Sequence, residues 1–299
     1  MKWTHDDIPD QTGKIAIVTG ANTGIGFETA RALAKKGARV ILACRSREKG
    51  EAAVARIAAE QPQSRAEFAA LDLADLDSVR AFAESFVGQN DRLDLLINNA
   101  GVMMCPESKT AQGYELQFGV NHLSHFALTA LLLPLLCTTP NARAVTVSSM
   151  AHRSGKMAFD DLNFTSRGYS PMGAYCQSKL ANLLFTFELQ RKLNVAGGDT
   201  IAVAAHPGWT STDLQRHTWW ARMLNPLFSM SPEKGALPTL RAATAPDVKG
   251  SEYYGPNGFR EMRGYPVRVG KTDAAKNPED AARLWTVSEE MTGFRAEVL

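Results

Sequence analysis

The sequence of 299 residues lacks the usual marks of a nucleic-acid or metal-binding protein. Its 33 Lys and Arg residues and 31 Asp and Glu residues leave a formal net charge of +2, so no polyanion-binding surface is indicated. The four cysteines, Cys44, Cys105, Cys137 and Cys176, form no CxxC pair, which argues against both a zinc motif and a disulfide framework. We therefore expect reduced thiols, no metal site and no nucleic-acid partner.

The sequence also shows no membrane span and no secretory signal. Its most apolar stretch, residues 126–137, is far shorter than the roughly 20 residues that a span needs, and Pro134 interrupts it. Residues 1–12 are polar and rich in Asp, without the apolar segment of a secretory signal. We expect a cytoplasmic protein with no transmembrane segment.

Strands and helices alternate along most of the chain. Apolar, β-branched runs predict six strands, at residues 15–19, 39–43, 67–71, 93–97, 144–147 and 201–205. Helical patterns lie between these strands, from about residue 25 and at residues 48–60, 78–87, 113–136 and 173–193. Apolar strands separated by helices indicate an α/β fold, a doubly wound parallel sheet covered on both faces.

The whole chain, residues 1–299, is expected to form one domain. Apolar residues make up 44% of it, enough for a large core, and we find no internal repeat and no low-complexity linker. After Pro207 the pattern becomes irregular and rich in Pro and Gly. We interpret this part as a C-terminal extension of the same domain.

A glycine-rich turn directly follows the first expected strand. It reads Gly20-Ala21-Asn22-Thr23-Gly24-Ile25-Gly26, a GxxxGxG spacing. Glycines allow the backbone to turn tightly and to approach a pyrophosphate, which the N-terminus of the next helix then stabilises. An ordinary turn would also tolerate these glycines, but the strand before it and the helix after it favour dinucleotide binding.

The end of the second strand indicates which dinucleotide is bound. A site that selects NAD places an acidic residue there to bind the ribose 2′-hydroxyl. This chain instead has Arg45 and Arg47, with no carboxylate before Glu48. Because a guanidinium suits a 2′-phosphate, we expect a preference for NADP(H), with NAD(H) as the second choice. The alternative is that both arginines are solvated loop residues.

Tyr175 and Lys179 are four residues apart and so share one face of a predicted helix. An ammonium beside a phenol favours its ionised form and would lower its pKa from about 10. Such a tyrosine can exchange a proton with an alcohol or carbonyl oxygen. The pair alone is a weak signal, because it arises easily by chance.

Further polar groups follow the fourth and fifth expected strands. Asn98-Asn99-Ala100-Gly101 follows the fourth strand, and Ser148-Ser149 follows the fifth. Asn121 lies within the next long helix. Each could be a simple cap or a satisfied amide, but ligands bind at this carboxyl edge of a doubly wound sheet.

Together these motifs resemble the short-chain dehydrogenase/reductase family over roughly residues 14–214. The resemblance implies a Rossmann fold that carries NAD(P)H and an enzyme that interconverts alcohols and carbonyl compounds. It implies that Tyr175 is the acid/base and that Lys179 holds the nicotinamide ribose and lowers the pKa of the tyrosine. It also implies that Ser149 orients the substrate oxygen and that Asn121 holds a water of a proton relay.

The same resemblance implies the remainder of the cofactor site. Asp72 would lie by the adenine, Asn98 and Gly101 near the ribose, and Thr212 by the carboxamide. The full set of expected cofactor-binding residues is Gly20, Asn22, Thr23, Gly24, Ile25, Gly26, Arg45, Asp72, Leu73, Asn98, Ala100, Gly101, Tyr175, Lys179, Pro207, Gly208, Thr210 and Thr212.

One departure from the usual family pattern indicates a branch. Ser149 and Tyr175 are 26 positions apart, whereas many members have a spacing of about a dozen. The longer segment, with the residues around Tyr175, is similar to the branch of retinol dehydrogenases and their bacterial relatives. Most of those relatives have no assigned substrate, so activity on retinoids does not follow.

The segment of about residues 209–232 is expected to cover the substrate. It contains Trp219-Trp220, which as a lid would favour a bulky, apolar alcohol or carbonyl compound. The same residues could instead form core, a contact with a second subunit, or a contact with a membrane surface. The resemblance also suggests a homodimer through the two long helices.

Two other classes of protein are considered beside an enzyme of this family. A non-catalytic, NADP(H)-sensing regulator on the same fold would be expected to lack Tyr175 or Lys179, and both are present. A methyltransferase with a related fold would want an acidic residue near the second strand end and needs no Tyr/Lys pair. The sequence favours the oxidoreductase.

Overall fold

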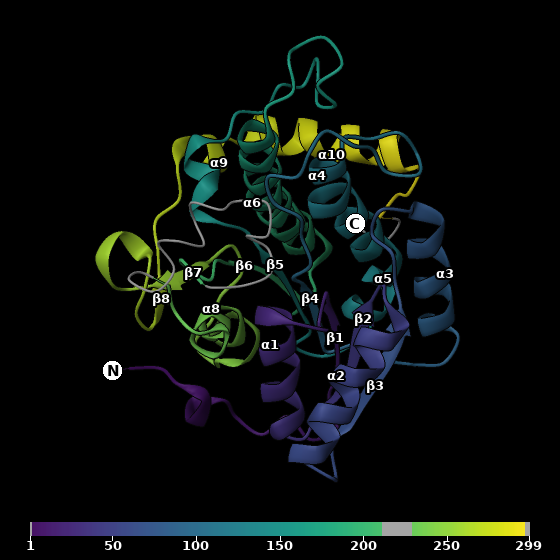
Figure 1. The fold of residues 1–299 in the computed structure, drawn as a ribbon, viewed down its shortest axis with the longest axis vertical. Coiled ribbons are helices and arrows are strands. Elements are labelled where there is room, and N and C mark those ends of the chain that lie inside the picture. Colours follow the sequence, from purple (N-terminus) through teal and green to yellow (C-terminus); the bar gives the residue numbers. More distant parts are fainter. Residues whose placement is uncertain (1, 211–228, 297–299) are drawn as a thin grey trace.

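A sheet of eight strands runs through the part of the protein that the structure, a computed structural model, describes: residues 2–210 and 229–296 (Figure 1). The strand order is β3-β2-β1-β4-β5-β6-β7-β8, and the pairs are parallel except β7 with β8. The strands are β1 (Ile15–Thr19), β2 (Arg39–Cys44), β3 (Arg65–Ala70), β4 (Leu95–Asn98), β5 (Arg143–Val147), β6 (Ile201–Ala205), β7 (Tyr253–Pro256) and β8 (Pro266–Arg268).

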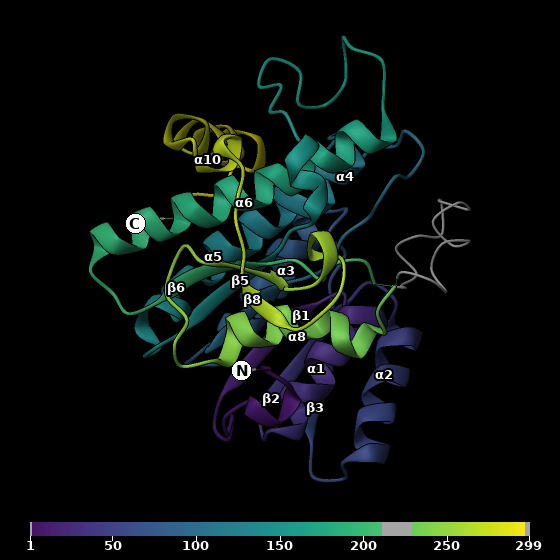
Figure 2. The ribbon, with the colours of Figure 1, turned by 90° about the vertical axis from the view of Figure 1, so that its left-hand side faces the viewer.

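Helices cover both faces of this sheet (Figure 2). On one face lie α1 (Gly24–Lys35), α2 (Arg47–Glu60) and α8 (Pro232–Thr244). On the other lie α3 (Leu76–Val87), α5 (Ser124–Thr138) and α6 (Pro171–Ala196). Along β1, Ile17 points to the second group of helices and its neighbours Ala16 and Val18 to the first, the alternation expected of a buried strand. The expected single-domain, doubly wound α/β fold is confirmed.

Each of the six expected strands is present, with ends shifted by at most two residues. Helix α6 shows why the sequence determines these elements well. Ser170 caps its N-terminus by accepting a hydrogen bond from the Gly173 N–H, Pro171 stands at its first position, and Gly197 ends it in the left-handed region at φ +77°. These signals fix the helix that carries Tyr175 and Lys179.

The long helix that the sequence predicts over residues 113–136 has an interruption. It consists of α4 (Leu116–Phe118), a π-helical turn at Gly119–Leu123 and α5. Asn121 lies in the π turn, where its amide exchanges two hydrogen bonds with the backbone of Val102, at 2.8 and 3.0 Å. Such single π turns are frequent at functional sites.

This interrupted helix is also very apolar. Leu116–Thr138 is the one helix in the described residues that is long and apolar enough to cross a membrane, and 78% of its most apolar part is buried inside the protein. Packing in the core between α3 and α6 therefore accounts for its composition.

The region after Pro207 contains more regular structure than the sequence pattern indicates. It adds α8, β7 and β8 to the sheet layers, followed by α9 (Asp273–Lys276) and α10 (Pro278–Thr292). Strands β7 and β8 are short, carry Pro or Gly, and contain no long apolar run, and α8 includes Pro238. Pairing with β6 and packing on α1 stabilise them where local propensity does not.

Candidate active site

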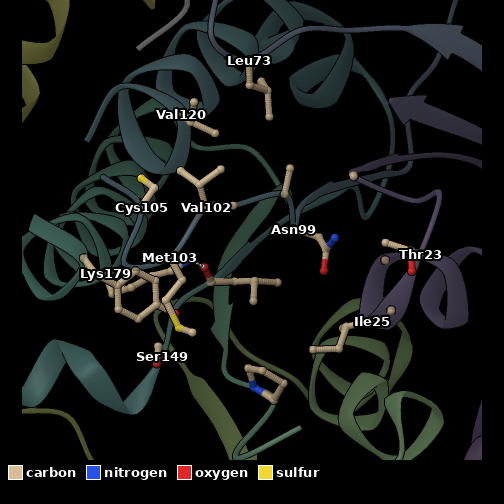
Figure 3. A pocket seen from close by; sticks show the side chains of 18 of the residues that line it. Thr23, Ile25, Leu73, Asn99, Val102, Met103, Cys105, Val120, Ser149 and Lys179 are labelled. Atoms are coloured by element: carbon tan, nitrogen blue, oxygen red, sulfur yellow. Dashed lines mark hydrogen bonds between the residues drawn. The ribbon is translucent and has the colours of Figure 1, made fainter. Parts of the chain in front are cut away.

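A cavity of about 810 Å³ opens at the carboxyl ends of β1, β2, β4, β5 and β6 (Figure 3). This is the edge at which open α/β sheets bind ligands, and the volume lies within the range of small-molecule sites. Most of the residues that the sequence assigns to a site line it: Gly20, Asn22, Thr23, Gly24, Ile25, Gly26, Arg45, Asp72, Leu73, Ala100, Gly101, Ser149, Tyr175, Lys179, Pro207, Gly208 and Thr210.

The glycine turn forms one end of the cavity, where Figure 3 shows Thr23 and Ile25. Gly20 and Gly24 have φ values of +65° and +58°, a region that L side chains rarely adopt. A Cβ atom on Gly26 would lie 2.4 Å from the Gly20 carbonyl oxygen. These glycine positions therefore have no room for a side chain. The N-terminus of α1 faces the cavity, an arrangement that fits a pyrophosphate.

The rim at the end of β2 is positively charged. Arg45, Ser46 and Lys49 line the cavity, and Arg45 is exposed. Arg47 does not line it, because its guanidinium pairs with Glu51 at 2.9 Å and lies over the Phe68 ring. The rim therefore presents Arg45 and Lys49, whereas Arg47, which the sequence also suggests for a 2′-phosphate, does not line the cavity.

The two asparagines at the end of β4 have different environments. Asn98 is fully buried away from the cavity, where its Nδ2 donates to the Thr129 hydroxyl at 2.9 Å. Asn99 lines the cavity, and its Nδ2 donates to the Thr19 carbonyl at 2.8 Å. Successive side chains of an extended strand point to opposite sides, so only one of the two can face the ligand. The sequence pattern predicts a site role for Asn98 and gives no signal for Asn99, which is the one whose side chain lines the cavity.

Tyr175, Lys179 and Ser149 line the other end of the cavity. Figure 3 shows Lys179 and Ser149 there. The Lys179 Nζ lies 5.8 Å from the centre of the Tyr175 ring and donates to the Val147 carbonyl at 3.0 Å. The Ser149 side chain lies close enough to the Tyr175 phenol to favour its ionised form. The Ser148 hydroxyl turns instead to the Lys179 carbonyl at 2.7 Å, which supports Ser149 as the residue that faces a ligand.

Burial determines the protonation states at this end. It raises the pKa of the Tyr175 phenol to about 12, although the nearby Ser149 side chain acts in the opposite direction. It lowers the pKa of the Lys179 ammonium to about 8. In the free protein the pKa of Tyr175 is therefore raised rather than lowered, because the burial of the phenol is the largest influence on it.

Asn121 lies behind the cavity wall rather than on it. Its Nδ2 also donates to the Ser178 hydroxyl at 2.9 Å. A Cβ atom on Gly101 would stand 3.1 Å from the Asn121 Oδ1 and 3.6 Å from the Lys179 Nζ, so both polar atoms flank this glycine. The absence of a side chain at Gly101 leaves room between Asn121 and Lys179.

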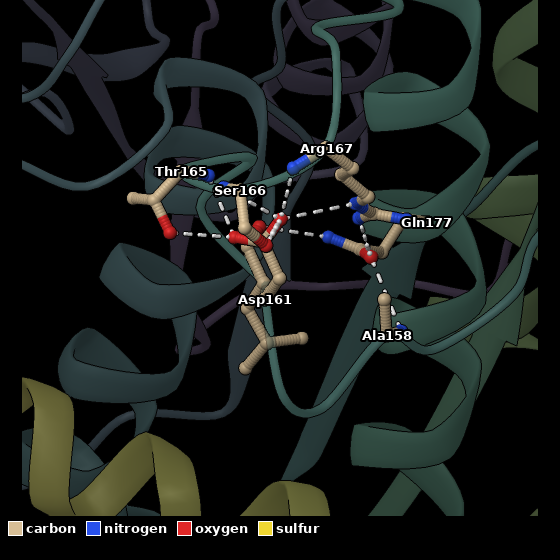
Figure 4. Close-up of polar contacts among 7 residues, drawn as sticks. Ala158, Asp161, Thr165, Ser166, Arg167 and Gln177 are labelled. Atoms are coloured by element: carbon tan, nitrogen blue, oxygen red, sulfur yellow. Dashed lines mark hydrogen bonds and ion pairs between the residues drawn. The ribbon is translucent and has the colours of Figure 1, made fainter.

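The segment that separates Ser149 from Tyr175 is fixed to α6 (Figure 4). The carboxylate of Asp161 accepts hydrogen bonds from the backbone N–H groups of Thr165, Ser166 and Arg167, at 2.6–3.1 Å. Arg167 donates to the Gln177 side chain at 2.7 Å, and Gln177 stands two residues after Tyr175. The longer spacing of this branch therefore forms an ordered loop rather than a loose insertion.

The remaining wall is mainly apolar. It is formed by Met103, Met104, Cys105, Met172 and Trp209. Of these residues only Trp209 belongs to the segment that the sequence predicts to cover the substrate. The expected Trp219-Trp220 pair and Thr212 lie outside the described residues. No group of three or more His, Cys, Asp or Glu side chains in the described part of the chain could hold a metal ion, and the four cysteines are free thiols.

Comparisons with known proteins show the family of this chain. The family model of short chain dehydrogenases matches residues 14–222. Human retinol dehydrogenase 12 is 47% identical over 288 residues, which cover 95% of this chain and 88% of the relative, and human retinol dehydrogenase 13 is 44% identical over 296 residues.

Solved structures with a similar fold include one of an uncharacterised protein and one of a short-chain dehydrogenase. A crystal structure of an uncharacterised protein from Mycobacterium paratuberculosis has a TM-score of 0.84 at 45% identity and covers 99% of each chain. A short-chain dehydrogenase from Shigella flexneri, complexed with NADP, has a TM-score of 0.67 at 26% identity and covers 83% of this chain and 97% of its own.

The chain belongs to the short-chain dehydrogenase/reductase family. It is an oxidoreductase of the kind that interconverts alcohols and carbonyl compounds with NAD(P)(H), and within the family it resembles the branch that contains the retinol dehydrogenases.

Proposed function

We propose that this protein is an NADP(H)-dependent enzyme that interconverts a bulky, apolar alcohol and the corresponding carbonyl compound. The observation that carries the proposal is the meeting of Tyr175, Lys179 and Ser149 at one end of a cavity whose other end is the glycine turn. When bound, the nicotinamide cofactor supplies or accepts the hydride. The chain's own residues must then bind the substrate oxygen and move its proton.

Tyr175 is the proposed acid/base. With a pKa of about 12 its phenol is neutral in the free protein, so it is able to donate a proton to a carbonyl oxygen. Ser149, whose side chain lies near the Tyr175 phenol at the same end of the cavity, would orient the same oxygen. Lys179 would stabilise the phenolate that remains, since an ammonium lowers the pKa of a neighbouring phenol once it is charged and held close.

Asn121 is proposed to support the return of the proton. Its Oδ1 and the Lys179 Nζ flank Gly101, a position without a side chain, so a water between them would have polar partners on both sides. A path from Lys179 to solvent through such a water would reprotonate Tyr175 between turnovers. Because the Asn121 amide is fixed by Val102, its orientation is maintained without a ligand.

The cofactor residues are proposed by position in the cavity. The turn of Gly20 to Gly26 would hold the pyrophosphate, Asp72 and Leu73 would lie by the adenine, and Ala100 with Gly101 would lie near the ribose. Arg45 and Lys49 at the rim favour a 2′-phosphate, and the NADP complex of the Shigella flexneri relative is consistent with this choice. The side chain of Asn98 is directed elsewhere, so only its backbone is available to this role.

The segment of residues 209–232 is proposed to cover the substrate. Trp209 lines the apolar part of the cavity together with Met103 and Met172, and methionine side chains adapt readily to irregular apolar ligands. This composition supports a bulky apolar substrate, of which the retinoids named for the relatives are one class.

The proposal is tested with a panel of aldehydes, ketones and alcohols, scored by NADPH absorbance. In Tyr175→Phe we expect kcat to fall by about 10²- to 10⁴-fold, the usual effect of removing a positioned acid/base, while the Kd for NADPH changes little. Tyr265→Phe is the matched control, since Tyr265 lies outside the cavity. Substantial turnover by Tyr175→Phe would exclude the mechanism, and NADPH binding without any turnover by the wild type would favour the regulatory alternative.

A further inference from the structure

Glu261 lies outside the active-site cavity and connects two of its walls. The first wall is the turn that follows Ser149, and the second is the turn at Pro207–Gly208. Glu261 lies in the short 3-10 turn Phe259–Glu261, between β7 and β8. Its Oε1 accepts a hydrogen bond from Arg153 at 2.7 Å, and its Oε2 pairs with the His206 Nε2 at 3.0 Å. Arg153 belongs to the 3-10 turn Met150–Ser154 that starts directly after Ser149, and His206 directly precedes Pro207.

The His206 ring has a defined tautomer. Its Nδ1 accepts a hydrogen bond from the Gly208 N–H at 3.2 Å, so the ring proton resides on Nε2 and is donated to Glu261. The His206 side chain is 1% exposed, and burial lowers its pKa, which favours this neutral form. The carboxylate of Glu261 therefore receives two donors, one from each wall.

The backbone around Glu261 also supports the second wall. The Met262 carbonyl accepts a hydrogen bond from the Trp209 N–H at 2.8 Å. Gly208 has a φ of +68°, and a Cβ atom there would lie 2.6 Å from the same carbonyl oxygen. Gly208 and Trp209 thus rest directly on the loop that carries Glu261.

This loop is held in a costly conformation. Arg260 and Glu261 have φ values of +49° and +59°, in the left-handed region that non-glycine residues seldom adopt. Such a conformation persists only where its surroundings enforce it, and it is concentrated at functional sites. Here it directs the Glu261 carboxylate between Arg153 and His206.

Hydrogen bonds also connect the turn that carries Arg153 to Ser149. The Ser149 carbonyl lies 2.7 Å from the His152 Nδ1, and the Ser149 hydroxyl accepts from the Ala151 N–H at 3.2 Å. A displacement of Arg153 would therefore be transmitted to Ser149. A displacement of His206 would be transmitted to Pro207 and Gly208.

We propose that Glu261 is a positioning residue for the reaction: by bridging Arg153 and His206, it holds the Ser149 turn and the Pro207–Gly208 turn at a fixed separation across the cavity. This inference rests on the proposed function, because it assumes that these turns present groups to the substrate and the cofactor. It assigns no contact between Glu261 and either ligand.

The test is Glu261→Gln. A glutamine presents one oxygen and one NH2 group, so one of the two donors, Arg153 or His206, would face another donor. Because a misplacement of about 1 Å can cost about 100-fold in rate, we expect kcat to fall about 10- to 100-fold. The KM for NADPH should rise by a smaller factor than kcat falls, because most of the proposed cofactor contacts, the glycine turn and Arg45 among them, lie on other elements than the Pro207–Gly208 turn. Glu261→Asp, which retains both acceptors, should recover part of kcat.

Glu252→Gln is the matched control. Like Glu261, the Glu252 carboxylate accepts hydrogen bonds from two side chains, here Tyr254 and Arg268. Neither of these partners belongs to the Ser149 turn or to the Pro207–Gly208 turn. A loss of kcat in Glu261→Gln no larger than in this control, or an equal loss in kcat and in NADPH affinity, would overturn the proposal.

A second measurement does not depend on turnover. Amide hydrogen exchange of residues 149–154 and 206–210 should accelerate in Glu261→Gln and not in Glu252→Gln. Unchanged exchange at both turns would overturn the positioning role even in an active enzyme. If exchange at both turns is faster in Glu261→Gln but the wild type shows no NADPH-dependent turnover, the positioning of the turns by Glu261 is supported and the proposed function is refuted.

Discussion

Arg45→Asp should reverse the cofactor preference of this enzyme. Arg45 lies exposed on the rim of the cavity at the end of β2, where an aspartate would bind a ribose 2′-hydroxyl and repel a 2′-phosphate. We expect the wild type to have a higher kcat/KM with NADPH than with NADH, and the variant to have the opposite order.

The magnitude follows from the exposure of the side chain. A hydrogen bond to a charged group contributes roughly 1.5–3 kcal/mol when its partner is held in place, which is about 10- to 100-fold in affinity. Because Arg45 is exposed, solvent and salt reduce its contribution to about 10-fold. Lys49 contributes further attraction from the same rim. The aspartate adds repulsion, so the ratio of the two kcat/KM values should change by about 100-fold in total.

Arg47→Asp provides the control for this assay. Arg47 carries the same charge two residues away, but it pairs with Glu51 and does not line the cavity. Steady-state rates with both cofactors, measured at two salt concentrations, should show a large change of preference for Arg45→Asp and less than about a 3-fold change for Arg47→Asp. Equal shifts in both variants would mean that only general loop charge matters, and no shift in either would refute a phosphate site at this rim.

Two predictions concern stability. Burial lowers the pKa of His122 to about 3 and of His125 to about 4, from 6.5, so the unfolded chain binds more protons below pH 6.5. The free energy of unfolding should therefore fall as the pH falls from 6.5 toward 4, by up to about 1.4 kcal/mol per pH unit for each histidine, and urea titrations with no such slope would contradict this. Trp285→Ala should cost about 3–5 kcal/mol in the same measurement, because the indole is 5% exposed and packs on Phe126 and Phe185; a loss below about 1 kcal/mol would show that this cluster is not part of the core.

Local signals in the sequence predict the first six strands and the end of the cavity that is proposed to bind phosphate. The glycine turn, the capped helix that carries Tyr175 and Lys179, and the polar residues after β5 all act through neighbours close in sequence. Such patterns place residues along an edge of the sheet. They do not determine which of two adjacent side chains faces the cavity.

The features that the sequence analysis missed depend on tertiary contacts. Asn98 and Asn99 are distinguished only by the pleat of β4 and by Thr129 on a helix. Glu261 reaches His206 across 55 positions, and the strands around it are too short to show a pattern. The pKa of Tyr175 rises because the folded core excludes water, a property of packing rather than of the spacing to a lysine.

The position of α10 has a consequence for how copies of this protein could associate. This helix packs along α6 and reaches α5, and Trp285 fills the space against Phe126 and Phe185. A homodimer through these two long helices, which the family resemblance suggests, would need the same surface to be open. Here the chain covers part of it with its own C-terminal segment, at a local concentration that no second molecule can match. Helix α10 and a second molecule would therefore compete for this part of the surface of α5 and α6. Self-association through it requires that α10 be displaced, and otherwise uses another face.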